Sequence, residues 1–314
     1  MKLNPMYKKE LKTSVRSSKL AWTIFVYNAI LAVIGLLAFY ACFANRSRIS
    51  YSDILAIYVC IACLEFGLIL FVVPALTSSA ISGERERQTL EILLTTTLKP
   101  IQIIIGKLCA SLSQIILLVL SSLPVLSLVF TVGGIRIQDL FMLTVICIVT
   151  AIFVGSIGIF YSTVFKRTVP ATVMTYGTLI VLIVASVVGL FILQLLLSHF
   201  YDQQYYTVNA TTNMTYNPPQ LGYLVLVLFW NPAVTICSML VEHIGGNNVL
   251  RDLFSDFGMK NEVIIQYWFQ ISIVVQMITS GILLGVSANK LNPLKAGKTV
   301  SKVSKKKKRE KKEK

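Results

Sequence analysis

The residue types that usually perform covalent or metal chemistry are few in this 314-residue chain, and their spacing fits no catalytic set. His199 and His243 have no serine, cysteine or carboxylate at a catalytic spacing, and the patterns HExxH and GxSxG do not occur. Cys60 and Cys63 have the spacing of a redox or zinc pair, but they lie in an apolar run without a second pair, as small packing residues do. Residues 296–299 (AGKT) resemble the end of a phosphate-binding loop that lacks its first glycine. We therefore expect no catalytic residue, metal site or nucleotide site on this chain.

The most informative charged feature is the block 84–87 (ERER), which lies between two apolar runs, 54–81 and 108–132. The first run contains a single charged residue and the second contains none. At about 1.5 Å of rise per helical residue, each run exceeds the roughly 30 Å hydrocarbon core of a bilayer. A mixed-charge segment between two such runs indicates a surface that is presented to a partner in the aqueous phase.

The local pattern predicts a helix over residues 84–94. Ser82 is placed to cap it, and Glu84 and Glu86 lie in its first turn, where negative charge suits the positive end of the helix dipole. Three leucines share a face opposite much of the charge: Leu90, Leu93 and Leu94. The pair Lys99-Pro100 interrupts the helix, and a second helical turn over 101–107 leads into the next apolar run. A solvated connecting loop is the alternative.

Glu65 is the single charge within the run 54–81. An ionisable group in the middle of a span costs about 2.5–3.5 kcal/mol on insertion scales, so it is a candidate for the translocation path or a subunit interface. The alternative is a hydrogen-bonded glutamate inside the bundle, facing Gln114, Gln194 or backbone.

The elements that position these residues follow from composition, since 55% of the chain is apolar and the mean hydropathy is +0.72. Continuous apolar runs favour helices over the alternating strands of a barrel. We therefore predict an all-α polytopic membrane protein with a six-helix transmembrane domain over 20–288. The expected spans are about 20–43, 54–81, 108–132, 140–165, 170–197 and 264–288.

The distribution of basic residues predicts the orientation. With both termini cytoplasmic, 24 of the 29 Lys and Arg residues lie on the inner side, which satisfies the positive-inside rule. We expect a cytoplasmic amphipathic helix over 1–19, and a basic, disordered cytoplasmic tail over 289–314 that contacts anionic lipid and binds no nucleic acid.

A seventh apolar stretch, 221–241, is interrupted by Asn231-Pro232. If it crossed the membrane, the basic tail would lie outside. We therefore predict a re-entrant element that turns at Asn231 and Pro232, within an outer segment 198–263 that begins as a polar loop.

The loop 83–107 resembles the first cytoplasmic loop of ABC transporter type-2 permeases, which typically reads E-[RK]-E-x-x-T-L-E-x-L-L and then Pro and Gly-Lys. The matching residues are Glu84, Arg85, Glu86, Thr89, Leu90, Glu91, Leu93 and Leu94, together with Arg87, Pro100, Gly106 and Lys107. Gln88 stands where the family often has Gly, and Pro100 lies slightly further along than usual. The opening Asn4-Pro5 and the Asn231-Pro232 element are similar to the family in layout.

The resemblance implies a permease subunit of the plasma membrane that pairs with a second, identical or paralogous permease. It also implies docking of a cytoplasmic ABC ATPase, which would carry the ATP and Mg, while this chain binds no cofactor and is no enzyme. Residues 84–94 would form the coupling helix, and export is the expected direction. Two alternatives stay open: a membrane enzyme acting on lipid-linked substrates, and a non-transporting membrane sensor or scaffold.

Overall fold

All elements in the described part of the chain are helices. The computed structural model describes residues 5–15, 17–44, 51–91, 95, 99–132, 136–209, 221–245, 251–252, 254–255, 257–259 and 261–291. Residues 292–314 of the tail expected over 289–314, residues 210–220 of the expected outer segment, and Leu93 and Leu94 lie outside these ranges, whereas residues 289–291 are the end of the last helix.

Six helical stretches within these ranges are long and apolar enough to cross a membrane, which confirms the predicted fold class. Such apolar segments can lie in lipid because a helix pairs its backbone N–H and C=O groups with one another. They are α2 (Ser18–Phe43), α3 (Tyr51–Thr77), α6 (Pro100–Val132), α7 (Ile137–Val164), the joined α8 (Thr168–Ile180), η1 (Val181–Ala185) and α9 (Ser186–Asn209), and α13 (Trp268–Leu291).

Shorter helices flank or connect these six. They are α1 (Pro5–Val15), α4 (Ser82–Glu86), the 3-10 helix η2 (Gly222–Trp230), α10 (Pro232–Gly245) and α12 (Glu262–Gln266). The helix α1 packs against α6, where Met6 is buried and the hydroxyl groups of Tyr7 and Ser113 lie 3.0 Å apart.

Two helices extend further than the sequence predicted. The third long helix begins at Pro100, so residues 101–107 form its first turns, and no separate helical turn precedes the span. The fifth continues past residue 197 to Asn209, where we expected a polar loop, because residues 198–209 contain no glycine or proline that would end it. Its apolar stretch Thr168–Gln203 spans 36 residues, or about 54 Å, so it is longer than a bilayer core is thick.

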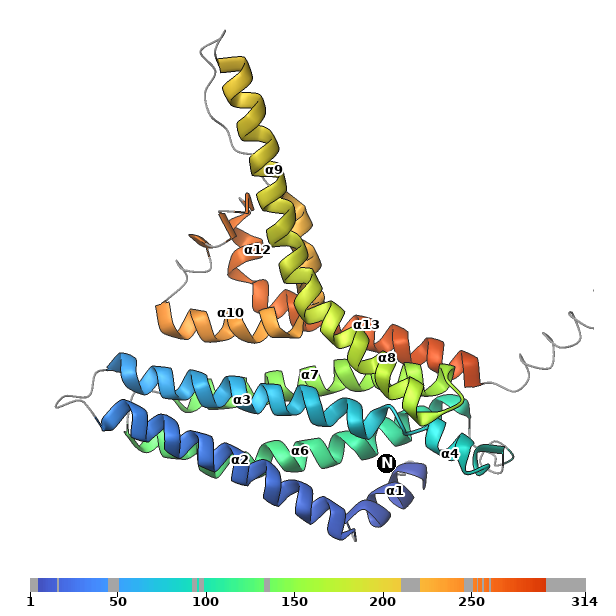
Figure 1. Cartoon of the computed structure of the whole chain (residues 1–314). Coiled ribbons are helices and arrows are strands. Elements are labelled where there is room, and N and C mark those ends of the chain that lie inside the picture. Colours follow the sequence, from blue (N-terminus) through green and yellow to red (C-terminus); the bar gives the residue numbers. More distant parts are fainter. Residues whose placement is uncertain are drawn as a thin grey trace, which may run out of the picture.

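The helix α7 lies at the centre of the bundle and packs against α3, α6 and α13. Its approach to α3 is close at Gly158, where an added Cβ would lie 2.1 Å from Oγ1 of Thr77. In Figure 1, α2, α3, α6 and α7 run side by side.

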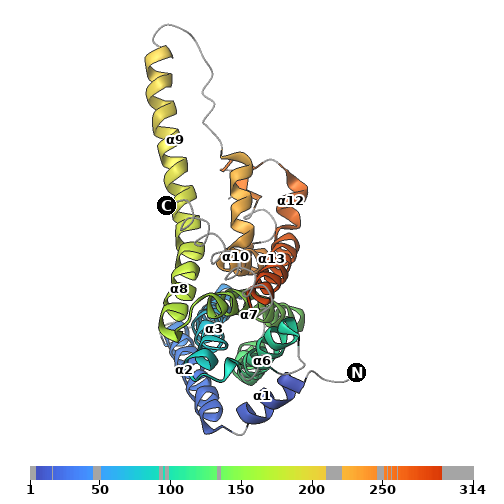
Figure 2. The ribbon, with the colours of Figure 1, turned by 90° about the vertical axis from the view of Figure 1, so that its right-hand side faces the viewer.

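The helices α2 and α9 expose most of their apolar surface. Figure 2 views the bundle from the end that carries α4 and shows α9 extending away from the other long helices. Only 6% of the apolar window in Thr168–Gln203 and 17% of that in α2 is buried. These two helices therefore present apolar side chains to lipid or to another protein.

Candidate functional site

Most of the charged block lies on α4, which begins at Ser82 after a turn over residues 78–81 that follows α3. The predicted cap was wrong, because Ser82 Oγ donates a hydrogen bond to the carbonyl of Ser78 (3.0 Å) within the preceding turn. The backbone N–H groups of Ile81 and Ser82 instead donate to Ser162 Oγ of α7, at 2.8 and 2.9 Å. A hydroxyl from another helix thus satisfies donors that the start of a helix leaves without partners.

The predicted helix over 84–94 is interrupted, because α4 ends at Glu86, residues 87–89 form a turn, and Leu90 and Glu91 are again helical. Gln88 has a φ of 59°, a left-handed conformation that breaks a right-handed helix. The turn is stabilised by Thr89, whose N–H and Oγ1 both donate to the carbonyl of Glu84, at 3.0 and 3.2 Å. Gln88 stands where the resemblance places a glycine, so the left-handed turn agrees with that position.

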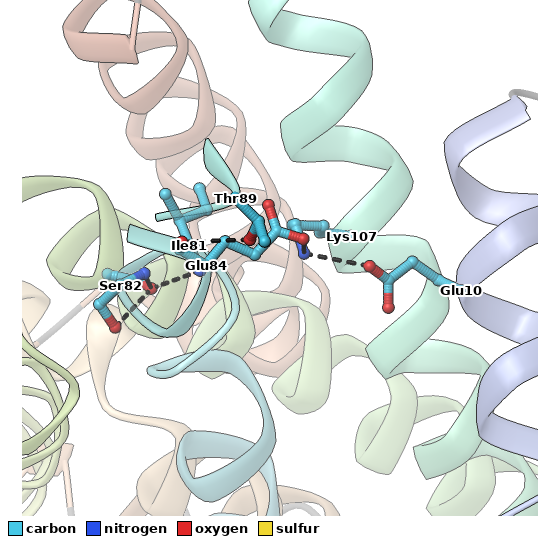
Figure 3. Close-up of polar contacts among 7 residues, drawn as sticks. Glu10, Ile81, Ser82, Glu84, Thr89 and Lys107 are labelled. Atoms are coloured by element: carbon cyan, nitrogen blue, oxygen red, sulfur yellow. Dashed lines mark hydrogen bonds and ion pairs between the residues drawn. The ribbon is translucent and has the colours of Figure 1, made fainter. Parts of the chain in front are cut away.

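Glu84 forms an ion pair inside the subunit. Its Oε1 lies 2.8 Å from Nζ of Lys107 on α6, and the same ammonium lies 3.1 Å from Oε1 of Glu10 on α1. Figure 3 shows Lys107 between the two carboxylates. Because the Lys107 side chain is only 6% exposed, this bridge holds the loop against α6 and α1.

Arg85 binds the end of α7. Its guanidinium donates to the carbonyl of Phe165 at 3.1 Å and to that of Thr163 at 3.4 Å. The last carbonyl groups of a helix lack partners within it and carry the negative end of its dipole, so a cation is favourable there.

Glu86 binds the start of α8. Its carboxylate accepts hydrogen bonds from the backbone N–H of Thr168 at 2.9 Å and from Thr168 Oγ1 at 3.0 Å. A carboxylate at a helix N-terminus satisfies an unpaired donor and interacts favourably with the dipole. The sequence predicted that Glu86 would stabilise the N-terminus of its own helix. In the structure it stabilises the N-terminus of α8 instead.

Leu90, one of the three leucines on the predicted apolar face, packs inside the subunit. It is buried in an apolar cluster with Ile81, Ile103, Ile104, Leu108, Ile159 and Leu291. Among the described residues 84–91, the exposed side chains are those of Glu86, Arg87, Gln88, Thr89 and Glu91, although the Glu86 carboxylate also binds Thr168. The charged loop thus has an inner face that binds its own helices and an outer face that is open.

Glu65 lies in the core of its own subunit and is 1% exposed. One carboxylate oxygen accepts a hydrogen bond from Ser122 Oγ of α6, so neither Gln114 nor Gln194 is the partner considered from the sequence. The other oxygen has no hydrogen-bond partner in the described part of the chain. This placement favours the interior alternative, while a role on a translocation path stays a prediction.

Asn231 and Pro232 lie at a 103° bend between η2 and α10. The Asn231 side chain is the cap of α10, because its Oδ1 accepts from the N–H groups of Ala233 (2.9 Å) and Val234 (3.3 Å). Its Nδ2 donates to the carbonyl of Ile183 at 3.0 Å and to Ser186 Oγ at 2.9 Å, within and just after the π-helical turn η1.

Sequence reasoning missed most of the residues that hold the charged loop. Lys107 was noted only for its resemblance, and Glu10, Ser162 and Thr168 were not considered as its partners. Lys107 carried a usable signal, because a lysine directly before an apolar run requires a carboxylate when it is buried. Ser162 and Thr168 carried none, since single hydroxyl groups do not indicate their distant partners.

Comparison with known proteins gives one family. The sequence model of the family described as ABC-2 family transporter protein matches residues 5–288. No curated protein matches the chain.

Proposed function

The chain belongs to the ABC-2 transporter protein family, and we propose that it pairs with a second permease and docks a cytoplasmic ABC ATPase to export a substrate. The match over nearly the whole chain makes it a permease subunit of an ABC transporter, as the resemblance implied. The ATP and Mg would be bound by the ATPase. The subunit would lie in the plasma membrane with both chain termini in the cytoplasm.

The observation that supports this proposal is that one short charged block contacts four helices. Glu84 is linked through Lys107 to α6 and α1, Arg85 holds the end of α7, and Glu86 holds the start of α8. A force applied to such a loop moves these four helices together or breaks charge-assisted contacts. Transmission of ATP-driven motion to spans requires a stiff joint of this kind.

The outer face of the loop is the surface that would contact the ATPase. Arg87, Gln88, Thr89 and Glu91 are exposed, and their mixed charge can set the register of a docked partner. The predicted coupling role is thereby divided: the inner residues transmit force, and the outer residues receive it.

Pairing with a second permease is supported by α2 and α9, because most of the apolar surface of these two helices is not buried within the subunit. The orientation is supported by the excess of basic residues on the side that carries α4 and the α7–α8 turn, where Lys166 and Arg167 are exposed.

The first prediction separates the two faces of the loop. Tagged permease is purified from native membranes, and the co-purified ATPase is quantified for each variant. Glu91→Lys should reduce the retained ATPase at least about tenfold, since breaking a docked charge contact costs about 2–5 kcal/mol. Glu86→Gln, which changes a carboxylate that faces α8, should retain it.

Lys12→Glu is the matched control, because it reverses an exposed charge on α1, outside the loop sequence. All three variants should elute as folded protein on size exclusion. Full retention of the ATPase by Glu91→Lys would contradict docking on this face.

A further inference from the structure

A cavity of about 500 Å³ lies where α1, α2, α3 and α6 meet the charged loop. Its walls include cationic, neutral polar and apolar side chains. We propose that it binds an anionic phospholipid of the cytoplasmic leaflet, with the phosphate between Lys19 and Arg87 and an acyl chain along the apolar wall.

The charge of the cavity favours a phosphate. Lys19 on α2 and Arg87 after α4 both line it, and neither forms an ion pair within the described part of the chain. The one carboxylate among the lining residues, that of Glu10, lies 3.1 Å from Lys107, which it shares with Glu84. Two cations without counter-ions therefore face one cavity, and the guanidinium of an arginine suits the oxygens of a phosphate.

The start of α2 adds to this preference. Ser17 and Lys19 line the cavity, and the Ser17 side chain accepts from the Lys19 N–H at 3.2 Å as the helix cap. The positive end of a 26-residue helix thus lies at the same wall as the two cations.

The apolar wall distinguishes a lipid from a free phosphate ion. Leu20 and Ile24 on α2, Leu76 on α3 and Leu118 on α6 line the remainder of the cavity. An inorganic phosphate has no apolar surface to bury against this wall, whereas an acyl chain does. The cavity also lies at the first turn of a membrane-length helix, which is the depth of lipid headgroups.

The test measures binding of phosphatidylglycerol to the purified full chain in phosphatidylcholine nanodiscs. Wild-type protein should bind the anionic lipid saturably and in preference to phosphatidylcholine. The double variant Lys19→Gln/Arg87→Gln should bind it about 30-fold more weakly, since each cation beside an anionic headgroup strengthens binding roughly fivefold.

Two further variants keep this test decisive. Lys8→Gln/Lys12→Gln removes two exposed cations from α1 that do not line the cavity, and its affinity should stay within about twofold of wild type. Gln114→Trp fills the cavity without changing charge and should also abolish saturable binding, which covers the case in which the charge variant misfolds.

Equal losses in the two double variants would show general surface attraction and overturn the site. Unchanged binding in Gln114→Trp would also overturn it. Competition by inorganic phosphate at the same concentration as the lipid would identify an ion site and reject the lipid. The permease is tested alone, so the result is independent of ATPase docking.

Discussion

The carboxyl group of Glu65 occupies a position that an apolar side chain could also fill. Its neighbours are core residues of α2, α3, α6 and α7, and its hydrogen-bond donor Ser122 has a second acceptor, the carbonyl of Val119 at 2.8 Å. Loss of the carboxylate therefore does not leave the Ser122 hydroxyl without a partner. Burial of an ionisable group in a span is costly, so its removal need not destabilise the bundle.

At the residue scale we predict that Glu65→Gln and Glu65→Met both fold, with thermal unfolding midpoints in detergent within a few degrees of wild type. Either change keeps the volume of the side chain, and volume-conserving changes usually cost less than about 1.5 kcal/mol. The ATP hydrolysis of the assembled transporter should also be retained. Loss of that hydrolysis with an unchanged midpoint would move Glu65 to a functional role.

The bend at Asn231 shows how one side chain can fix two elements. Its amide caps α10 and at the same time bonds the π-helical turn, where the regular backbone ladder of the fifth span is interrupted. Pro232 follows as the first helical residue, where its missing N–H costs nothing. The bent pair is thereby attached to the longest span.

At the element scale we predict that Asn231→Ala lowers the free energy of unfolding by about 2–4 kcal/mol, because it removes a cap and two buried donor contacts. Asn231→Asp should recover part of this loss, since it keeps the cap acceptor but places a carboxylate against the Ile183 carbonyl. Thermal unfolding in nanodiscs measures both.

Ser198→Ala serves as the control, because the partly exposed Ser198 hydroxyl donates to the Leu195 carbonyl of its own helix and to no other element that the structure describes. Equal stability of Asn231→Ala and this control would refute the dual role of Asn231.

At the scale of the whole molecule, the sequence predicted the six long apolar helices well because lipid leaves an apolar run few alternatives to a helix. It located the break at Asn231-Pro232 for the same local reason. It could not predict the partners of the charged loop, since Glu86 meets Thr168 across more than eighty intervening positions. It also misplaced the end of α4, because the left-handed Gln88 overrode the helix propensity of its neighbours.

The last prediction concerns how the chain crosses the membrane. The bent pair Gly222–Trp230 and Pro232–Val241 is either a broken span or a re-entrant loop, and the two differ in which side follows it. The basic asymmetry requires six spans and cytoplasmic termini, so the segments before and after the pair should lie on the same, outer side.

In a variant with its six cysteines replaced by alanine, Tyr205→Cys and the exposed Arg251→Cys should both be labelled by an impermeant thiol reagent from outside. Lys99→Cys and Lys305→Cys should be labelled only after the membrane is opened. Protection of position 251 with labelling of 205 would make the bent pair a seventh span and place the basic tail outside.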